Sequence, residues 1–156
     1  RLLAPAAARP PMIERHESVL VTTFVRVLIP LAQLFALYVL VHGHGSPGGG
    51  FQAGVILGAT YITLALALGR EALDRRVNEP MCVALGAGGV LLYLMTGVFG
   101  MVGGGTFLDY SALPLPVSPV RARYFGILFV ETGVAIAVAA TVVVLFCRLA
   151  DREDRR

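Results

Sequence analysis

The sequence contains little charge, no lysine and only two cysteines. Charged residues make up 15% of its 156 positions and hydrophobic residues 56%, a balance far from that of a water-soluble domain. This shortage of charge excludes an ordinary soluble fold and places the chain in a lipid bilayer. Cys82 and Cys147 lie too far apart in sequence to suggest a disulfide framework or a metal site, so we expect both to be packing residues.

Long apolar runs occupy most of the chain. A hydrocarbon core of about 30 Å needs roughly 20 apolar residues per helix, and we expect transmembrane helices at about 19–41, 51–69, 82–102 and 124–147. The predicted fold class is all-α, a polytopic integral membrane protein with four transmembrane helices. Its transmembrane domain covers 19–147, between an N-terminal tail (1–18) and a C-terminal tail (148–156). We expect no cleaved secretory signal, because the first run is long and no small-residue cleavage site follows it.

All thirteen basic residues are arginine, and they are unevenly placed. Ten lie before the first run, between the second and third, or after the fourth: Arg1, Arg9, Arg15, Arg70, Arg75, Arg76, Arg148, Arg152, Arg155 and Arg156. Only Arg121 and Arg123 lie on the opposite side of the membrane. By the positive-inside rule, both termini should be cytoplasmic. The positive charge then reflects orientation and anionic lipid headgroups, and we expect no nucleic-acid partner.

A glycine-dense turn joins the first two apolar runs. Pro47 is followed by Gly48, Gly49, Gly50 and Phe51, a backbone path that residues with larger side chains would resist. The turn also contains a literal G-x-G-x-x-G, the pattern of a dinucleotide site. It follows a membrane span instead of a strand, and no acidic residue lies about twenty positions on. We therefore predict a structural turn and no nucleotide binding.

Small residues continue along the second run. Gly50, Gly54 and Gly58 recur every four residues, which leaves one helix face without side chains and permits close packing in lipid. This ridge either packs within the chain or forms a docking face for another subunit. The sequence leaves both possibilities open.

Four ionisable residues are candidates for an ion path. Glu131 lies inside the fourth run, where a carboxylate is costly and must face protein or water; it is either a structural acid or a proton or cation relay. Arg26 lies in the first run, where it either snorkels to the interface or pairs with an acid of another subunit. We expect no direct pair between Arg26 and Glu131. His42 and His44 are expected to be surface or interfacial residues with too few neighbouring ligands for a metal site; the alternative is that one of them relays protons at a channel mouth.

One segment carries a family resemblance: His44-Gly45-Ser46-Pro47-Gly48-Gly49-Gly50-Phe51-Gln52-Ala53-Gly54. It resembles the signature of the B subunit of Mrp-type multisubunit cation/proton antiporters, the MnhB family. The similarity extends to Gly86-Ala87-Gly88 and Thr96-Gly97-Val98 in the third run, Phe107-Leu108 after it, Glu131-Thr132-Gly133-Val134 in the fourth, and the basic residue Arg26. Gln52-Ala53-Gly54 departs from the family, in which many members have a further glycine after the phenylalanine.

The resemblance implies a four-helix subunit of a multi-pass assembly in the inner (cytoplasmic) membrane of a prokaryote. Such an assembly exchanges Na⁺ for H⁺ and is related to the proton-pumping arm of respiratory complex I. Sibling membrane subunits would be its partners, and the subunit would serve assembly or line an ion route. Two alternatives remain: the equivalent subunit of a redox-driven relative such as a membrane-bound hydrogenase, and a purely structural membrane protein. An enzyme is not expected and no cofactor is predicted, because the sequence has no nucleophile-base pair, metal cluster or cofactor loop.

Overall fold

The computed structural model describes residues 18–43 and 48–153, and within them it is helical with no β-strand. The elements are α1 (Val19–His42), α2 (Gly50–Leu68), α3 (Arg70–Asp74), α4 (Glu79–Val102), the 3-10 helix η1 (Tyr110–Ala112) and α5 (Pro119–Glu153). Four of these, α1, α2, α4 and α5, are long and apolar enough to cross a membrane. The prediction of an all-α chain with four long apolar helices is confirmed.

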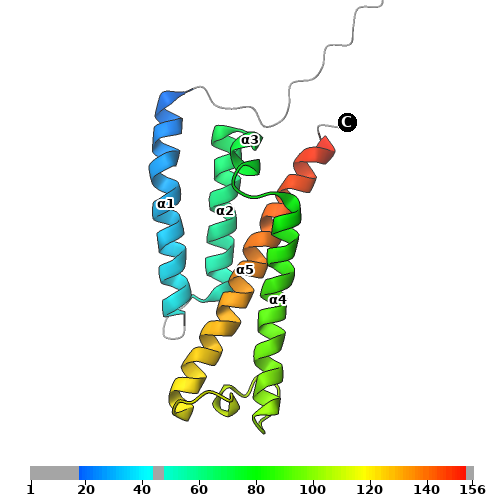
Figure 1. The fold of residues 1–156 in the computed structure, drawn as a ribbon. Coiled ribbons are helices and arrows are strands. Elements are labelled where there is room, and N and C mark those ends of the chain that lie inside the picture. Colours follow the sequence, from blue (N-terminus) through cyan, green and yellow to red (C-terminus); the bar gives the residue numbers. More distant parts are fainter. Residues whose placement is uncertain (1–17, 44–47, 154–156) are drawn as a thin grey trace, which may run out of the picture.

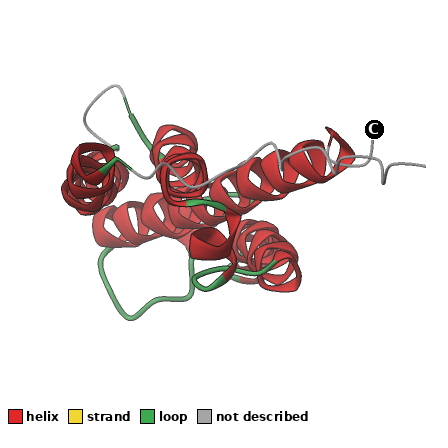
Figure 2. Cartoon of the chain, turned by 90° about the horizontal axis from the view of Figure 1, so that it is seen from above, coloured by secondary structure: helices red, strands yellow, loops and turns green. Residues whose placement is uncertain are grey.

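The helices form an antiparallel bundle arranged around α5. α1 begins and α5 ends at one end of the bundle, called here the terminal end, together with α3 (Figure 1). α1 ends and α2 begins toward the opposite end, which we call the loop end and at which the segment from Gly103 to Ser118 lies (Figure 1). Seen along the bundle, α5 runs between α2 and α4, and α1 packs outside α2 (Figure 2). α1 therefore leaves most of its surface uncovered by this chain.

The helix ends differ from the expected spans, and local capping explains the differences. α4 begins at Glu79, not near 82, because the Asn78 side chain accepts a hydrogen bond from the Met81 backbone N–H at 2.9 Å, a standard N-cap. α5 begins at Pro119, not near 124, since proline fits the first turn of a helix. α2 ends at Leu68 because Gly69 takes a φ of 85°, which favours glycine and stops a helix.

The connector between α2 and α4 carries charged residues along most of its length and still buries one apolar side chain. It contains α3, whose Leu73 is 1% exposed and packs in a core cluster with Ala65, Ala140, Val143, Cys82 and Cys147. Both cysteines are buried and free, as expected for packing residues. Ion pairs surround this cluster: Arg70 contacts Asp74 and Asp151 at 3.1 Å each, and Arg148 contacts Glu79. The terminal end is thus closed by a small apolar core under charged groups.

The glycine ridge of α2 lies directly against α5. A Cβ atom at Gly54 would lie 2.6 Å from the Ala135 carbonyl oxygen, and one at Gly58 would lie 3.0 Å from the Val142 side chain. On the opposite side of α5, a Cβ at Gly89 of α4 would lie 2.5 Å from the carbonyl oxygen of Gly133. These separations leave no space for larger residues, so the ridge is occupied within the chain. A docking face for another subunit must therefore lie elsewhere.

The segment after α4 folds back over the bundle. The Phe107 ring fills the space above Gly97, and Tyr110 of η1 packs against Gly126 of α5. Asp109 holds this segment together, because its carboxylate accepts hydrogen bonds from the Ser111 backbone N–H at 3.0 Å and the Ser111 hydroxyl at 2.5 Å. These bonds hold the pKa of the exposed Asp109 carboxyl below its ordinary value.

Candidate functional site

Glu131 lies where the turn between α1 and α2 meets α5. Its carboxylate packs against glycine backbone: a Cβ at Gly43 would lie 2.7 Å from Oε2, and one at Gly49 would lie 3.1 Å from Oε1. Gly50 contacts the Glu131 backbone so closely that a Cβ there would overlap its carbonyl oxygen. Gly49 has a φ of 121°, a conformation that other residues rarely adopt. The glycines of the turn therefore let the backbone close over this carboxylate.

Glu131 lies partway along α5, so the glycines of the turn that contact it lie short of the loop end of the bundle. Arg123 and Arg148 bracket a 24-residue stretch of α5 in which Glu131 is the single charged residue. Such a stretch is about 36 Å long, close to the thickness of the hydrocarbon core. Glu131 follows Arg123 by eight residues, so it lies about 12 Å along the helix from that arginine. Gly43 and Gly49 contact its carboxylate and therefore lie level with it.

A tyrosine of the segment after α4, Tyr110, lies near Glu131. Burial raises the pKa of Tyr110, and the nearby groups Tyr93 and Glu131 raise it further. Tyr93 also packs edge-on against Phe107, with 6.5 Å between ring centroids. The folded segment after α4 thus contributes a phenol near the carboxylate. Proximity of a tyrosine to Glu131 is not visible in the sequence, because residues 110 and 131 belong to different elements.

The other described candidates, His42 and Arg26, lie on α1. His42 is exposed in the last turn of α1, where its ring stacks on Tyr38 at 4.3 Å and Nδ1 lies 3.1 Å from the Tyr38 carbonyl oxygen. His44 and Pro47 lie outside the described residues. Arg26 is exposed on α1, 17 residues before Gly43, or about 25 Å along the helix. It therefore cannot reach Glu131, and the expected absence of a direct pair between them agrees with this geometry.

Some described residues around the start of α2 are exposed. Phe51 is 67% exposed at the start of α2, and Gly48 is also exposed. Among the described residues, no cluster of three or more His, Cys, Asp or Glu side chains is arranged to hold a metal ion. Glu131 packs against Gly43 and Gly49 of the turn.

Comparison with known proteins decides the family. A family model described as "Domain related to MnhB subunit of Na+/H+ antiporter" matches residues 20–144. The chain belongs to the MnhB family. Three curated relatives of this MnhB chain are aligned over most of their own length. They are the Na(+)/H(+) antiporter B subunits of Bacillus subtilis (27% identity; 83% of this chain, 95% of the relative) and of Alkalihalophilus pseudofirmus (24%; 82% and 94%), and the putative antiporter subunit mnhB2 of Staphylococcus aureus (28%; 80% and 93%).

Two polar contacts of this MnhB family member were not predicted from the sequence. Gln33 of α1 donates a hydrogen bond to the Thr60 hydroxyl of α2 at 3.4 Å, and Thr60 donates to the Leu57 carbonyl oxygen. Gln33 was a detectable signal, since an amide inside an apolar run needs a partner. The second contact is that of Arg70 with Asp74 and Asp151. Burial acts to lower the pKa of Arg70, but the Asp74 hydrogen bond and the surrounding charges outweigh burial and raise that pKa.

Proposed function

We propose that the chain is a membrane subunit of a multisubunit Mrp-type Na⁺/H⁺ antiporter. The match of the family model to residues 20–144 carries this proposal, because it includes α1, α2 and α4 almost entirely and most of α5. Relatives named as antiporter subunits align over the same region. The four long apolar helices support a multi-pass location, which we assign to the inner membrane of a prokaryote. Both termini face the cytoplasm in this proposal, so the loop end faces outward.

Sibling subunits complete the surface around Glu131. Backbone that is not helical is tolerated at membrane depth only where protein or water covers it. Gly43 and Gly49 pack against the carboxylate, while α5 continues for twelve residues toward the loop end. We infer from this that the turn lies at membrane depth. A neighbouring subunit or a water-filled space must therefore cover the turn. In the proposed function, the space beside the turn lets cations or protons reach Glu131 from the loop end.

Substitution of Glu131 in the whole antiporter complex tests the role of this residue. We expect Glu131→Gln to abolish most Na⁺/H⁺ exchange in reconstituted vesicles, since the amide fills the same space but cannot carry charge or a proton. Glu131→Asp should retain part of the exchange. Glu71→Gln is the matched control, because Glu71 is an exposed acid of α3 at the terminal end. It should leave exchange unchanged.

Assembly must be measured in the same samples. Co-purification of the sibling subunits with the Glu131→Gln chain shows that the complex forms and that the loss concerns transport. Full exchange by an intact Glu131→Gln complex would refute the ion-path role. Recovery of the unmodified chain as a lone monomer from mild detergent would refute the subunit assignment itself.

A further inference from the structure

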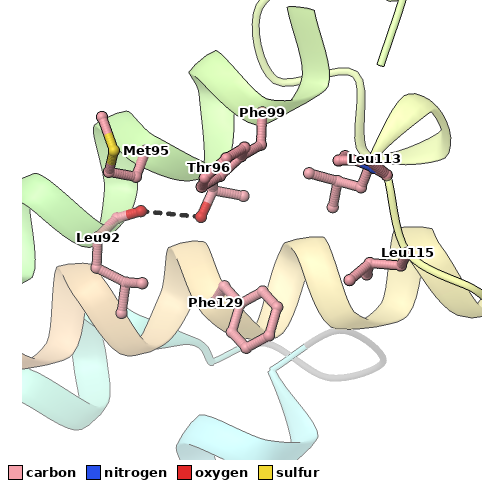
Figure 3. A pocket seen from close by; sticks show the side chains of 8 residues that line it. Leu92, Met95, Thr96, Phe99, Leu113, Leu115 and Phe129 are labelled. Atoms are coloured by element: carbon pink, nitrogen blue, oxygen red, sulfur yellow. Dashed lines mark hydrogen bonds between the residues drawn. The ribbon is translucent and has the colours of Figure 1, made fainter. Parts of the chain in front are cut away.

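An apolar pocket lies at the loop end, away from Glu131. Its volume is about 350 Å³, and it is enclosed by α4, α5 and the segment before α5 (Figure 3). Its lining residues are Leu92, Met95, Thr96, Phe99, Leu113, Pro114, Leu115 and Phe129. This volume is at the lower end of the range for small-molecule sites, about 300 to 1,000 Å³.

The chemistry of the pocket suits a hydrocarbon. Thr96 provides its one side-chain hydroxyl, which donates to the Leu92 carbonyl oxygen at 2.8 Å and is therefore already bonded (Figure 3). Met95, Phe99 and Phe129 are 39%, 50% and 41% exposed, so the pocket opens sideways, toward the lipid that surrounds a transmembrane helix. Leu113 is 9% exposed and belongs to the closed wall of the pocket.

A positively charged side chain, that of Arg121, lies on the same face of α5 as the phenyl rings beside the opening of the pocket. Arg121, Phe125 and Phe129 follow one another every four residues along α5, on neighbouring turns, and the two phenyl rings stack with 6.5 Å between centroids. Arg121 lies about 12 Å along the helix from Phe129, which places it at the headgroup level. It is exposed and forms no ion pair within 18–43 and 48–153. We propose that the pocket holds an acyl chain of an anionic phospholipid whose phosphate binds Arg121.

Photo-crosslinking tests this proposal in the assembled complex. The complex is reconstituted into vesicles of phosphatidylethanolamine and phosphatidylglycerol that contain a trace of phosphatidylglycerol with a diazirine halfway along one acyl chain. After irradiation, mass spectrometry locates the attached lipid. We expect attachment to concentrate at Met95, Phe99 and Phe129. A uniform spread over exposed apolar residues, or protection of these three because a sibling subunit fills the pocket, would overturn the proposal.

Variants separate the acyl-chain site from the phosphate site. Leu115→Trp fills the pocket from its loop wall and should lower attachment there about tenfold, which corresponds to about 1.4 kcal/mol. Leu145→Trp is the matched control, because Leu145 is 56% exposed on α5 and does not line the pocket. Arg121→Gln should weaken attachment of the phosphatidylglycerol probe and leave that of an uncharged diacylglycerol probe unchanged. Equal attachment of both probes to the Arg121→Gln complex and to the unmodified one would refute the role of Arg121.

Discussion

Gly50 shows how strictly one residue can be specified in this bundle. Any side chain at position 50 would overlap the backbone of Glu131, and backbone cannot move aside cheaply. Gly88, on α4, has nothing within 4 Å of the place where its Cβ would stand. The two glycines look alike in the sequence, yet the structure assigns them opposite tolerances.

We therefore expect opposite effects from the same substitution. Gly50→Ala should destabilise the chain by about 1 to 3 kcal/mol, the usual cost of overpacking a tight contact. Gly88→Ala should be neutral or stabilise it by up to about 1 kcal/mol, because alanine is the better helix former. Thermal unfolding of the purified complex in detergent measures both. Equal shifts in the two melting temperatures would contradict the packing of α2 on α5.

At the scale of single residues, Glu131 could be identified from the sequence because a carboxylate in an apolar run is conspicuous. It could not identify Tyr110, whose importance depends on the folding of η1 onto α5. Nor could it decide between packing within the chain and docking for the ridge of Gly50, Gly54 and Gly58. That decision requires the register of α2 against α5, which no local pattern contains.

Among the elements, the folded segment between α4 and α5 is stabilised by the carboxylate of Asp109. The pKa of Asp109 is lowered by its bonds with Ser111, so the ionised form stabilises the folded segment. This stabilisation is complete at pH values above 3.8, the ordinary pKa of an aspartate carboxyl. It is lost as the pH falls through the lower pKa that Asp109 has in the folded state.

Asp109→Asn should consequently loosen this segment at neutral pH, since a neutral amide accepts weaker hydrogen bonds than a carboxylate. Amide hydrogen exchange of residues 106–113, normalised to the intrinsic rate at each pH, measures the effect. The variant should exchange faster at neutral pH, and the difference should shrink as the medium becomes strongly acidic. A difference that persists unchanged in acid would show that the charge of Asp109 has no part in it.

The long helices were predicted correctly as elements, and the ends of α1 and α2 were predicted to within one residue, whereas α4 and α5 begin earlier and α5 ends later than expected. Apolar runs reveal what must lie in lipid, but Asn78 and Pro119 start α4 and α5 through capping and proline geometry outside those runs. Both signals were present in the sequence. The burial of Leu73 was not, because charged neighbours on α3 conceal one apolar side chain that reaches the core.

At the scale of the whole molecule, the arginine distribution predicts that the terminal end, where α1 begins and α5 ends, faces the cytoplasm. Ser118→Cys, at the loop end, should react with a membrane-impermeant maleimide added to intact cells. Arg152→Cys, at the terminal end, should react only after the membrane is opened. The unmodified chain is the control, because Cys82 and Cys147 are buried. Labelling of Arg152→Cys in intact cells would reverse the proposed topology.

The unequal lengths of α2 and α5 have a mechanical consequence for the membrane. The apolar stretch of α5 between Arg123 and Arg148 has 24 residues and α2 has 19, so the apolar part of α5 is about 7.5 Å longer. Hydrophobic mismatch costs a fraction of a kcal/mol for each ångström that a bilayer must stretch or thin. A longer apolar stretch fits the same bilayer when its helix tilts, and α5 crosses the bundle obliquely (Figure 1). The tilt of α5 therefore lets helices of unequal apolar length share one membrane thickness.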